Sequence, residues 1–140
     1  MNKPFFIETR KENFSILKVW INDGSNLDKT GKKGINQILS ELIIRGCINS
    51  DKHLLTEFIE SYGAELNQET LEDGIFINLK VMNEYFNEIY PLIDLIIEKP
   101  LLNENQFNVV KNIALQTVQR SKESLFNITF ENWRKITYLN

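Results

Sequence analysis

Three polar residues in the stretch GINQILSELIIRG, residues 34–46, have the spacing of a metal-binding helix. Gln37, Ser40 and Glu41 share one face of a predicted helix. Apolar residues surround them, namely Ile38, Leu39, Leu42, Ile43 and Ile44. A zinc hydrolase needs two imidazoles one helical turn apart, and a carboxylate that takes a proton from the metal-bound water. The stretch contains no histidine. The face is therefore either a zinc site that has lost its zinc chemistry or the polar stripe of an ordinary amphipathic helix.

Few other residues carry chemistry. His53 is the only histidine and Cys47 the only cysteine. We interpret His53 as a surface residue on the next helix. Cys47 is interpreted as a buried structural thiol, since no second cysteine or basic partner lies within reach in the sequence. One cysteine permits no internal disulfide and fits a reducing compartment, so we expect a cytoplasmic chain.

Length and composition indicate one folded domain. The chain has 140 residues, 42% hydrophobic content and a formal net charge of -3. Lysine and arginine are scattered rather than clustered, so no nucleic-acid partner is predicted. No run approaches the roughly 20 apolar residues of a membrane span, and the first 14 residues lack the apolar core of a secretory signal. We therefore predict no membrane partner.

The first half of the chain predicts a strand and two helices. FSILKVWIND, residues 14–23, is apolar on both alternating faces and predicts a strand buried on both sides, with FFIE, residues 5–8, as its hairpin partner. A helix is expected over residues 35–45, with Gly46 as its stop. The next helix lies within SDKHLLTEFIESYG, with Ser50 as its candidate N-cap.

The second half predicts a hairpin followed by three helices. AELNQET and GIFINLKV are strand-like, and the turn LEDG joins them. Helices are expected over about residues 83–99, over 103–124 with Asn103 as the cap, and from about Asn127 to Tyr138. This order indicates an α+β fold with helices packed on one face of an antiparallel sheet.

The sequence resembles the insulinase and pitrilysin family of zinc metallopeptidases, to which mitochondrial processing peptidase belongs. The stretch DGSNLDKTGKKGINQILSELIIRGC resembles the family's zinc-site region, which has Gly-Ser and then Gly-x-x-His-x-x-Glu-His-x-x-x-x-Gly-Thr. ESYGAELNQETLEDGIFINLKV resembles the family's Gly-x-x-Leu-Asn-x-x-Thr-x-x-Asp stretch, and IEKPLLNENQFNVVKNIALQTVQRS resembles a later helical segment. The matching positions are Gly24, Ser25, Gly34, Gly46, Gly63, Leu66, Asn67, Thr70 and Asp73.

All four positions that carry the family's chemistry are changed here. The resemblance places Gln37 at the first histidine, Ser40 at the glutamate base and Glu41 at the second histidine. The third ligand, a glutamate on a later long helix, falls at or beside Thr117. Gln37 is a poor zinc ligand and Ser40 cannot act as the general base. We therefore favour a degenerate site with no catalytic residue, no bound metal and no cofactor, since zinc is expected only in intact family members.

The resemblance covers essentially the whole chain, residues 1–140, which we take as one partial insulinase-type domain. Family domains continue beyond this point with further strands and a helix, so we expect the domain to be incomplete at its C-terminus. The favoured function is a non-catalytic subunit or domain that presents peptide to an active peptidase or supports it. Two alternatives stay open: an active metalloendopeptidase formed within a longer chain or complex, and a plain interaction or scaffold domain.

The resemblance also implies partners. These are a catalytic insulinase-type chain or a second domain, peptide segments, and a second copy that pairs through an unfinished sheet edge. Family substrates lie along an edge strand beside the zinc helix, and AELNQET is the matching stretch. We predict that Leu66 is buried, that Asn67 is accessible with an outward N–H, and that the strand, which ends at Thr70, lies at the sheet edge beside Gln37 and Glu41. The alternative is a short hairpin strand without a binding role.

Overall fold

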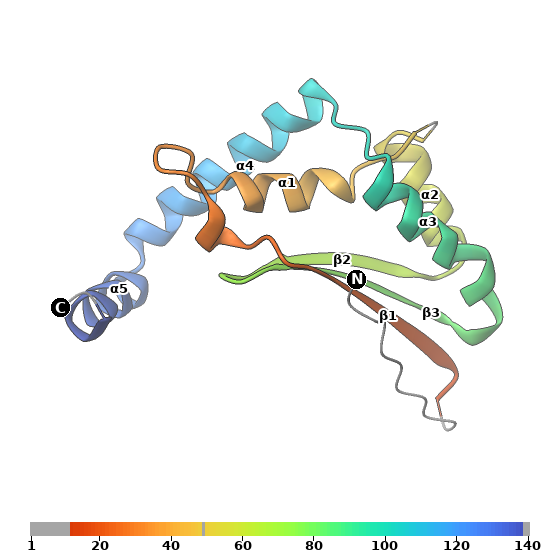
Figure 1. Ribbon diagram of the computed structural model, residues 1–140, viewed down its shortest axis with the longest axis horizontal. Coiled ribbons are helices and arrows are strands. Elements are labelled where there is room, and N and C mark those ends of the chain that lie inside the picture. Colours follow the sequence, from red (N-terminus) through yellow and green to blue (C-terminus); the bar gives the residue numbers. More distant parts are fainter. Residues whose placement is uncertain (1–11, 49, 139–140) are drawn as a thin grey trace. The chain divides into compact units, whose positions relative to one another are not determined.

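The computed structural model describes residues 12–48 and 50–138 of the chain (Figure 1). The described residues up to Leu101 form one compact unit, and those from Leu102 form a second. The segment 5–8, predicted as a hairpin partner, lies outside the described residues.

The first unit is a three-stranded antiparallel sheet with helices on one face (Figure 1). The strand order is β1-β3-β2, so β3 lies in the centre. The strands are β1 (Phe14–Ile21), β2 (Glu65–Thr70) and β3 (Ile75–Met82). The helices are α1 (Ile35–Ile43), α2 (Lys52–Ser61) and α3 (Phe86–Glu98), and single 3-10 turns cover Ser25–Leu27 and Asn83–Tyr85. The predicted α+β class is confirmed.

The core lies between β3 and the helices. Every second side chain of β3 is buried, as expected for a strand with one covered face. Helices α2 and α3 meet it with apolar residues one turn apart. The buried set is Leu55, Ile59, Ile75, Ile77, Leu79, Val81, Ile89, Ile93 and Ile96.

Strand β1 corrects one prediction. Its side chains alternate between exposed and half-buried, so the strand is not buried on both faces. Phe14, Ile16 and Trp20 point away from the core because α1, α2 and α3 cover only one face of the sheet. On this exposed face the ring of Trp20 contacts the ring of Phe76, and the two ring centroids are 4.4 Å apart. The contact covers part of the apolar surface.

Asp28 holds the start of α1. The N-cap residue of the helix is Gly34, which has φ of 88° and no side chain to cap the free N–H groups. Asp28 is 6% exposed, and its two carboxylate oxygens accept hydrogen bonds from Gly34 N at 2.6 Å and Asn36 N at 3.1 Å. Asn36 in turn donates to Asp23 Oδ1 and Gly24 O. The acidic loop before α1 therefore supplies the cap that the helix lacks.

The start of α2 corrects a second prediction. The N-cap is Asp51, whose carboxylate accepts from His53 N and Leu54 N. The predicted cap, Ser50, instead exchanges both backbone hydrogen bonds with Cys47, each at 2.9 Å. The helix ends near Gly63, which has φ of 58°.

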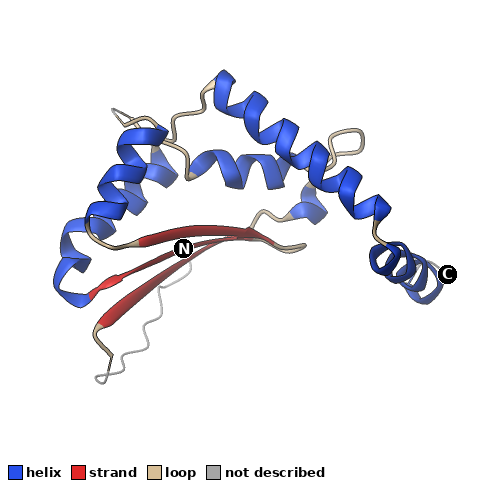
Figure 2. Cartoon of the chain, turned by 180° about the vertical axis from the view of Figure 1, so that it is seen from behind, coloured by secondary structure: helices blue, strands red, loops and turns tan. Residues whose placement is uncertain are grey.

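The second unit contains α4 (Glu104–Glu123) and α5 (Leu125–Tyr138), which turns away from α4 at Ser124 (Figure 2). Asn103 is confirmed as the cap of α4, because its side chain accepts from Asn105 N and Gln106 N. Helix α5 begins two residues earlier than predicted and contains no buried residue.

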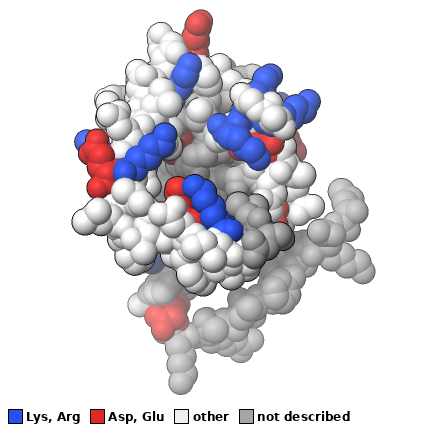
Figure 3. All heavy atoms as spheres, turned by 90° about the vertical axis from the view of Figure 1, so that its left-hand side faces the viewer, with Lys and Arg blue, Asp and Glu red and all other residues white. Residues whose placement is uncertain are grey.

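The surface carries charges of both signs. On the face in Figure 3, lysine and arginine side chains are interspersed with aspartate and glutamate. Among residues 12–48 and 50–138, no helix combines the length and apolar character needed to cross a membrane.

The cap formed by Asp28 is open to a stability measurement. We expect Asp28→Ala to lower the free energy of unfolding by about 1–2 kcal/mol, because two N–H groups at the helix start lose their acceptor. Urea denaturation measures the change. Asp94→Ala, the same substitution at an exposed residue of α3, is the control and should cost less than about 0.5 kcal/mol. Equal losses in the two variants would show that Asp28 does not cap α1.

Candidate functional site

The polar face of α1 points at strand β2. Gln37 and Glu41 lie one turn apart, and Gln37 Nε2 donates a hydrogen bond to Glu41 Oε1 at 3.0 Å. Both side chains are half-buried. The Gln37 amide thus engages one oxygen of the Glu41 carboxylate, which is the one common metal-binding group on this face.

Ser40 joins α1 to β2. Its side chain is fully buried, and Oγ lies 2.9 Å from Gln37 O, 3.1 Å from Gln68 Oε1 and 2.6 Å from Thr70 Oγ1. A hydroxyl group donates one proton and accepts others. Ser40 can therefore donate to Gln37 O or to Gln68 Oε1 while the Thr70 hydroxyl donates to Ser40. The result is a neutral network across the two layers.

These residues do not fit a zinc ion. Zinc in proteins takes thiolate, imidazole or carboxylate ligands, usually three or four of them. Of the residues at the family's positions only Glu41 is such a ligand. Thr117 lies on α4, is exposed, and donates its hydroxyl proton to Ile113 O at 3.0 Å. Across the described ranges, no group of three or more histidine, cysteine, aspartate or glutamate side chains could hold a metal ion.

His53 and Cys47 have the structural environments expected from the sequence. His53 is exposed on α2, with Nδ1 3.3 Å from Glu57 Oε2. Cys47 is 2% exposed, and burial raises the pKa of its thiol, so the reactive thiolate is disfavoured.

Strand β2 lies at the sheet edge next to α1, as predicted. It pairs only with β3 among the described strands, and its side chains alternate between exposed and half-buried. Asn67 is exposed as predicted, whereas Leu66 is half-buried and packs at the margin of the core. Leu66 is not fully covered because β2 has a strand neighbour on one side only.

The direction of the backbone groups corrects the prediction for Asn67. In an antiparallel pair, successive residues point their N–H and C=O groups alternately toward and away from the partner strand. Leu71 N donates to Gly74 O at 2.8 Å, which fixes this alternation along β2. The N–H groups that point at β3 are therefore those of every second residue, namely Leu71, Glu69 and Asn67. The N–H of Asn67 points at Asn78, its register partner on β3. The outward N–H groups belong to Leu66, Gln68 and Thr70.

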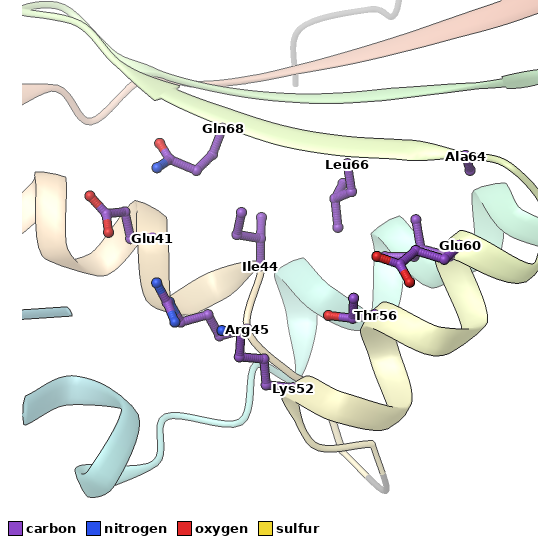
Figure 4. Close-up of a pocket in the computed structure, with 10 residues that line it drawn as sticks. Glu41, Ile44, Arg45, Lys52, Thr56, Glu60, Ala64, Leu66 and Gln68 are labelled. Carbon is purple, nitrogen blue, oxygen red and sulfur yellow. The ribbon is translucent and has the colours of Figure 1, made fainter. Parts of the chain in front are cut away.

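A groove lies beneath this edge, between α1, α2 and β2 (Figure 4). Its cavity volume is about 330 Å³. The lining combines apolar side chains with charged groups of both signs. The lining residues are Glu41, Ile44, Arg45, Lys52, Thr56, Ile59, Glu60, Ala64, Leu66 and Gln68. Sequence reasoning missed the contribution of α2, although Lys52, Thr56 and Glu60 recur every four residues and so share one face.

The edge strand, the facing helix and the one-sided sheet together define an α+β domain. The solved structures it resembles include a peptidase M16 inactive domain from Pseudomonas fluorescens, with a TM-score of 0.80, 16% identity, and coverage of 92% of this chain and 32% of that one. A protease from Helicobacter pylori has a TM-score of 0.75 and 19% identity, with coverage of 84% of this chain and 29% of that one.

The chain belongs to the insulinase family, peptidase family M16, whose profile matches residues 5–140. The resemblance found in the sequence is thereby confirmed. Curated relatives include cytochrome b-c1 complex subunit 1, mitochondrial, from Mus musculus, which is 24% identical over 113 residues. That match covers 81% of this chain, and the chain spans 24% of the relative's length. The subunit from Bos taurus is 23% identical over 112 residues, which cover 80% of this chain and 23% of that protein.

The hydroxyl of Ser40 can be tested by deletion. We expect Ser40→Ala to lower the free energy of unfolding by about 1–3 kcal/mol, because Gln68 and Thr70 lose a buried partner. Chemical denaturation measures the loss. Ser61→Ala is a matched control, since the Ser61 hydroxyl also donates to the carbonyl three residues earlier, at Phe58, but is exposed. A similar, small loss in both variants would exclude a bridging role for Ser40.

Proposed function

We propose that this chain is a non-catalytic peptidase-like domain that holds an extended peptide along β2, in support of an active peptidase chain or a second domain. The observation that carries the proposal is an edge strand with outward backbone groups beside a helix whose metal-site positions, an amide, a hydroxyl and a carboxylate, are hydrogen-bonded to protein groups.

The absence of catalysis rests on the chemistry of three side chains. An amide, a hydroxyl and a single carboxylate supply neither the ligand set nor the general base of a zinc hydrolase. The alternative, an active metalloendopeptidase, would need ligands from other parts of a longer chain or from a partner. Nothing in the network of Gln37, Ser40 and Glu41 favours it.

Peptide binding does not need the metal. A peptide that adds to a sheet edge is held by main-chain hydrogen bonds, and side-chain pockets give specificity. Leu66, Gln68 and Thr70 provide outward N–H and C=O groups along the edge, and the groove lies directly beneath Leu66 and Gln68 (Figure 4). Both requirements are met on one side of the domain.

A partner chain is supported by the relatives. One solved neighbour is described as an inactive domain, and the curated relatives are named as subunits of a complex. This chain spans about a quarter to a third of those proteins. A further domain or chain could therefore supply the catalytic half.

A second candidate function is that of a scaffold domain, and α5 favours it. Three of its aromatic residues, Phe126, Phe130 and Trp133, are 76%, 47% and 50% exposed and form successive ring contacts. Large exposed apolar faces are typical of interaction surfaces. Loss of partner binding on Trp133→Ala, with peptide binding retained, would separate this role from that of β2.

The degenerate site gives a chemical prediction. We expect the purified chain to bind no stoichiometric zinc and to cleave no peptide, because Glu41 alone cannot replace three ligands. Elemental analysis and a peptide-cleavage assay measure this. One zinc per chain, lost on Glu41→Ala, would overturn the proposal.

A rebuilt site serves as the positive control. The double variant Gln37→His and Glu41→His places two imidazoles one turn apart on α1, and it should gain zinc-dependent thermal stabilisation, since a ligand bound only by the folded state raises stability. Ser40 is kept because a buried carboxylate in its place would disturb the contacts to Gln68 and Thr70. A folded double variant without zinc affinity would show that positions 37 and 41 do not present their side chains to one ion, as the family motif requires.

The edge strand gives a second prediction. Proline at an outward position removes one N–H that faces the peptide and none that faces β3. We expect Gln68→Pro to weaken binding of an extended threonine- and valine-rich peptide at least tenfold relative to Gln68→Ala, which removes the same side chain and keeps the N–H. Fluorescence anisotropy measures binding and circular dichroism measures folding. Asn67→Pro should instead unfold β2, because its N–H points at β3. Equal peptide affinities for the two Gln68 variants would exclude pairing at this edge.

A further inference from the structure

The groove beneath β2 carries different charged residues at its two ends. Glu60 lies at the end near Ala64, whereas Lys52 lies beside Arg45 toward the end near Gln68 (Figure 4). Glu41 is also at the Gln68 end, where its carboxylate accepts from Gln37 Nε2. One end therefore carries two cationic groups and one carboxylate, and the other end carries one carboxylate.

Helix α2 contributes three residues of one face to the groove, and two of them carry opposite charges. Lys52, Thr56 and Glu60 are exposed and all line the groove. Eight residues of helix separate Lys52 from Glu60, which is about 12 Å along the axis. Between these charges the groove is lined by Thr56 and by the apolar side chains of Ile44, Ile59 and Leu66.

A peptide strand beside β2 would present side chains to this face at every second residue. Residues four apart in a strand point the same way and are separated by about 13 Å. That distance matches the separation of Lys52 and Glu60. A side chain between them would lie over the apolar part of the lining.

We infer that α2 selects among peptides by charge, and that the groove takes an extended peptide with a basic and an acidic side chain four residues apart. The basic side chain lies against Glu60 and the acidic one against Lys52. The inference rests on the proposed binding of peptide at β2, and it makes Lys52 and Glu60 determinants of specificity rather than of stability. Like charges at both positions of the peptide would place one of them against a group of its own sign.

The test uses three labelled ten-residue peptides of threonine and valine that differ only at two positions four apart. One carries lysine and glutamate, one carries two lysines, and one carries two glutamates. We expect the mixed peptide to bind the chain about fivefold more tightly than either of the others, as for ion pairs in a partly solvated groove. Glu60→Lys should shift the preference to the peptide with two glutamates.

Glu57→Lys is the matched control, because it makes the same change of charge on the same helix at a residue outside the groove. Its order of affinities should equal that of the unchanged chain. Equal binding of the three peptides, or the same shift in Glu57→Lys as in Glu60→Lys, would overturn the charge selection and leave the peptide edge standing. Failure of all three peptides to bind would overturn the edge proposal and the selection together.

Discussion

A fully buried hydroxyl between a helix and a sheet edge is stable only when it is hydrogen-bonded, and the site of this protein depends on that constraint at Ser40. Its partners come from both layers: Gln37 on α1, and Gln68 and Thr70 on β2. The network therefore fixes the rotation of α1 about its axis relative to the edge strand. Because the helix is fixed in this way, Gln37 and Glu41 face β2, and the groove keeps an open side between α1 and α2.

The same network holds α1 against β2 through groups that are not metal ligands. A bound ion would hold the helix through charged or imidazole ligands, whereas here neutral groups hold it directly to the strand. An ionised carboxylate at the position of Ser40 would be without water and would face an amide oxygen and a hydroxyl, which is costly. Serine is short enough to lie in the layer and has both a donor and an acceptor. Serine in place of the family's glutamate and glutamine in place of its first histidine are therefore compatible with each other, because both are uncharged.

Local patterns predicted much of this arrangement, and the failures share a physical cause. The alternation in GIFINLKV and the turn LEDG predicted the hairpin, and capping chemistry predicted Asn103. The family resemblance placed β2 at an edge beside α1. In contrast, the outward N–H groups of β2 depend on which pair of residues closes the hairpin, and the outward N–H predicted for Asn67 was wrong for that reason. Asp51 rather than Ser50 caps α2 because Ser50 is engaged with Cys47, a contact that forms only in the folded chain. The groove is assembled from α1, α2 and β2, so no single segment could indicate it.

An exposed sheet edge is a liability as well as a binding surface, since it can pair with any other strand. Strand β2 has only six residues, and its solvent-facing side chains are Glu65, Asn67 and Glu69. Short length and exposed carboxylates are features that limit unspecific edge pairing. They do not remove the outward backbone groups of Leu66 and Gln68, which remain available to a peptide whose side chains suit the groove. The proposed peptide capture needs no metal ligand, because it draws on the backbone of β2 and the charges of α2.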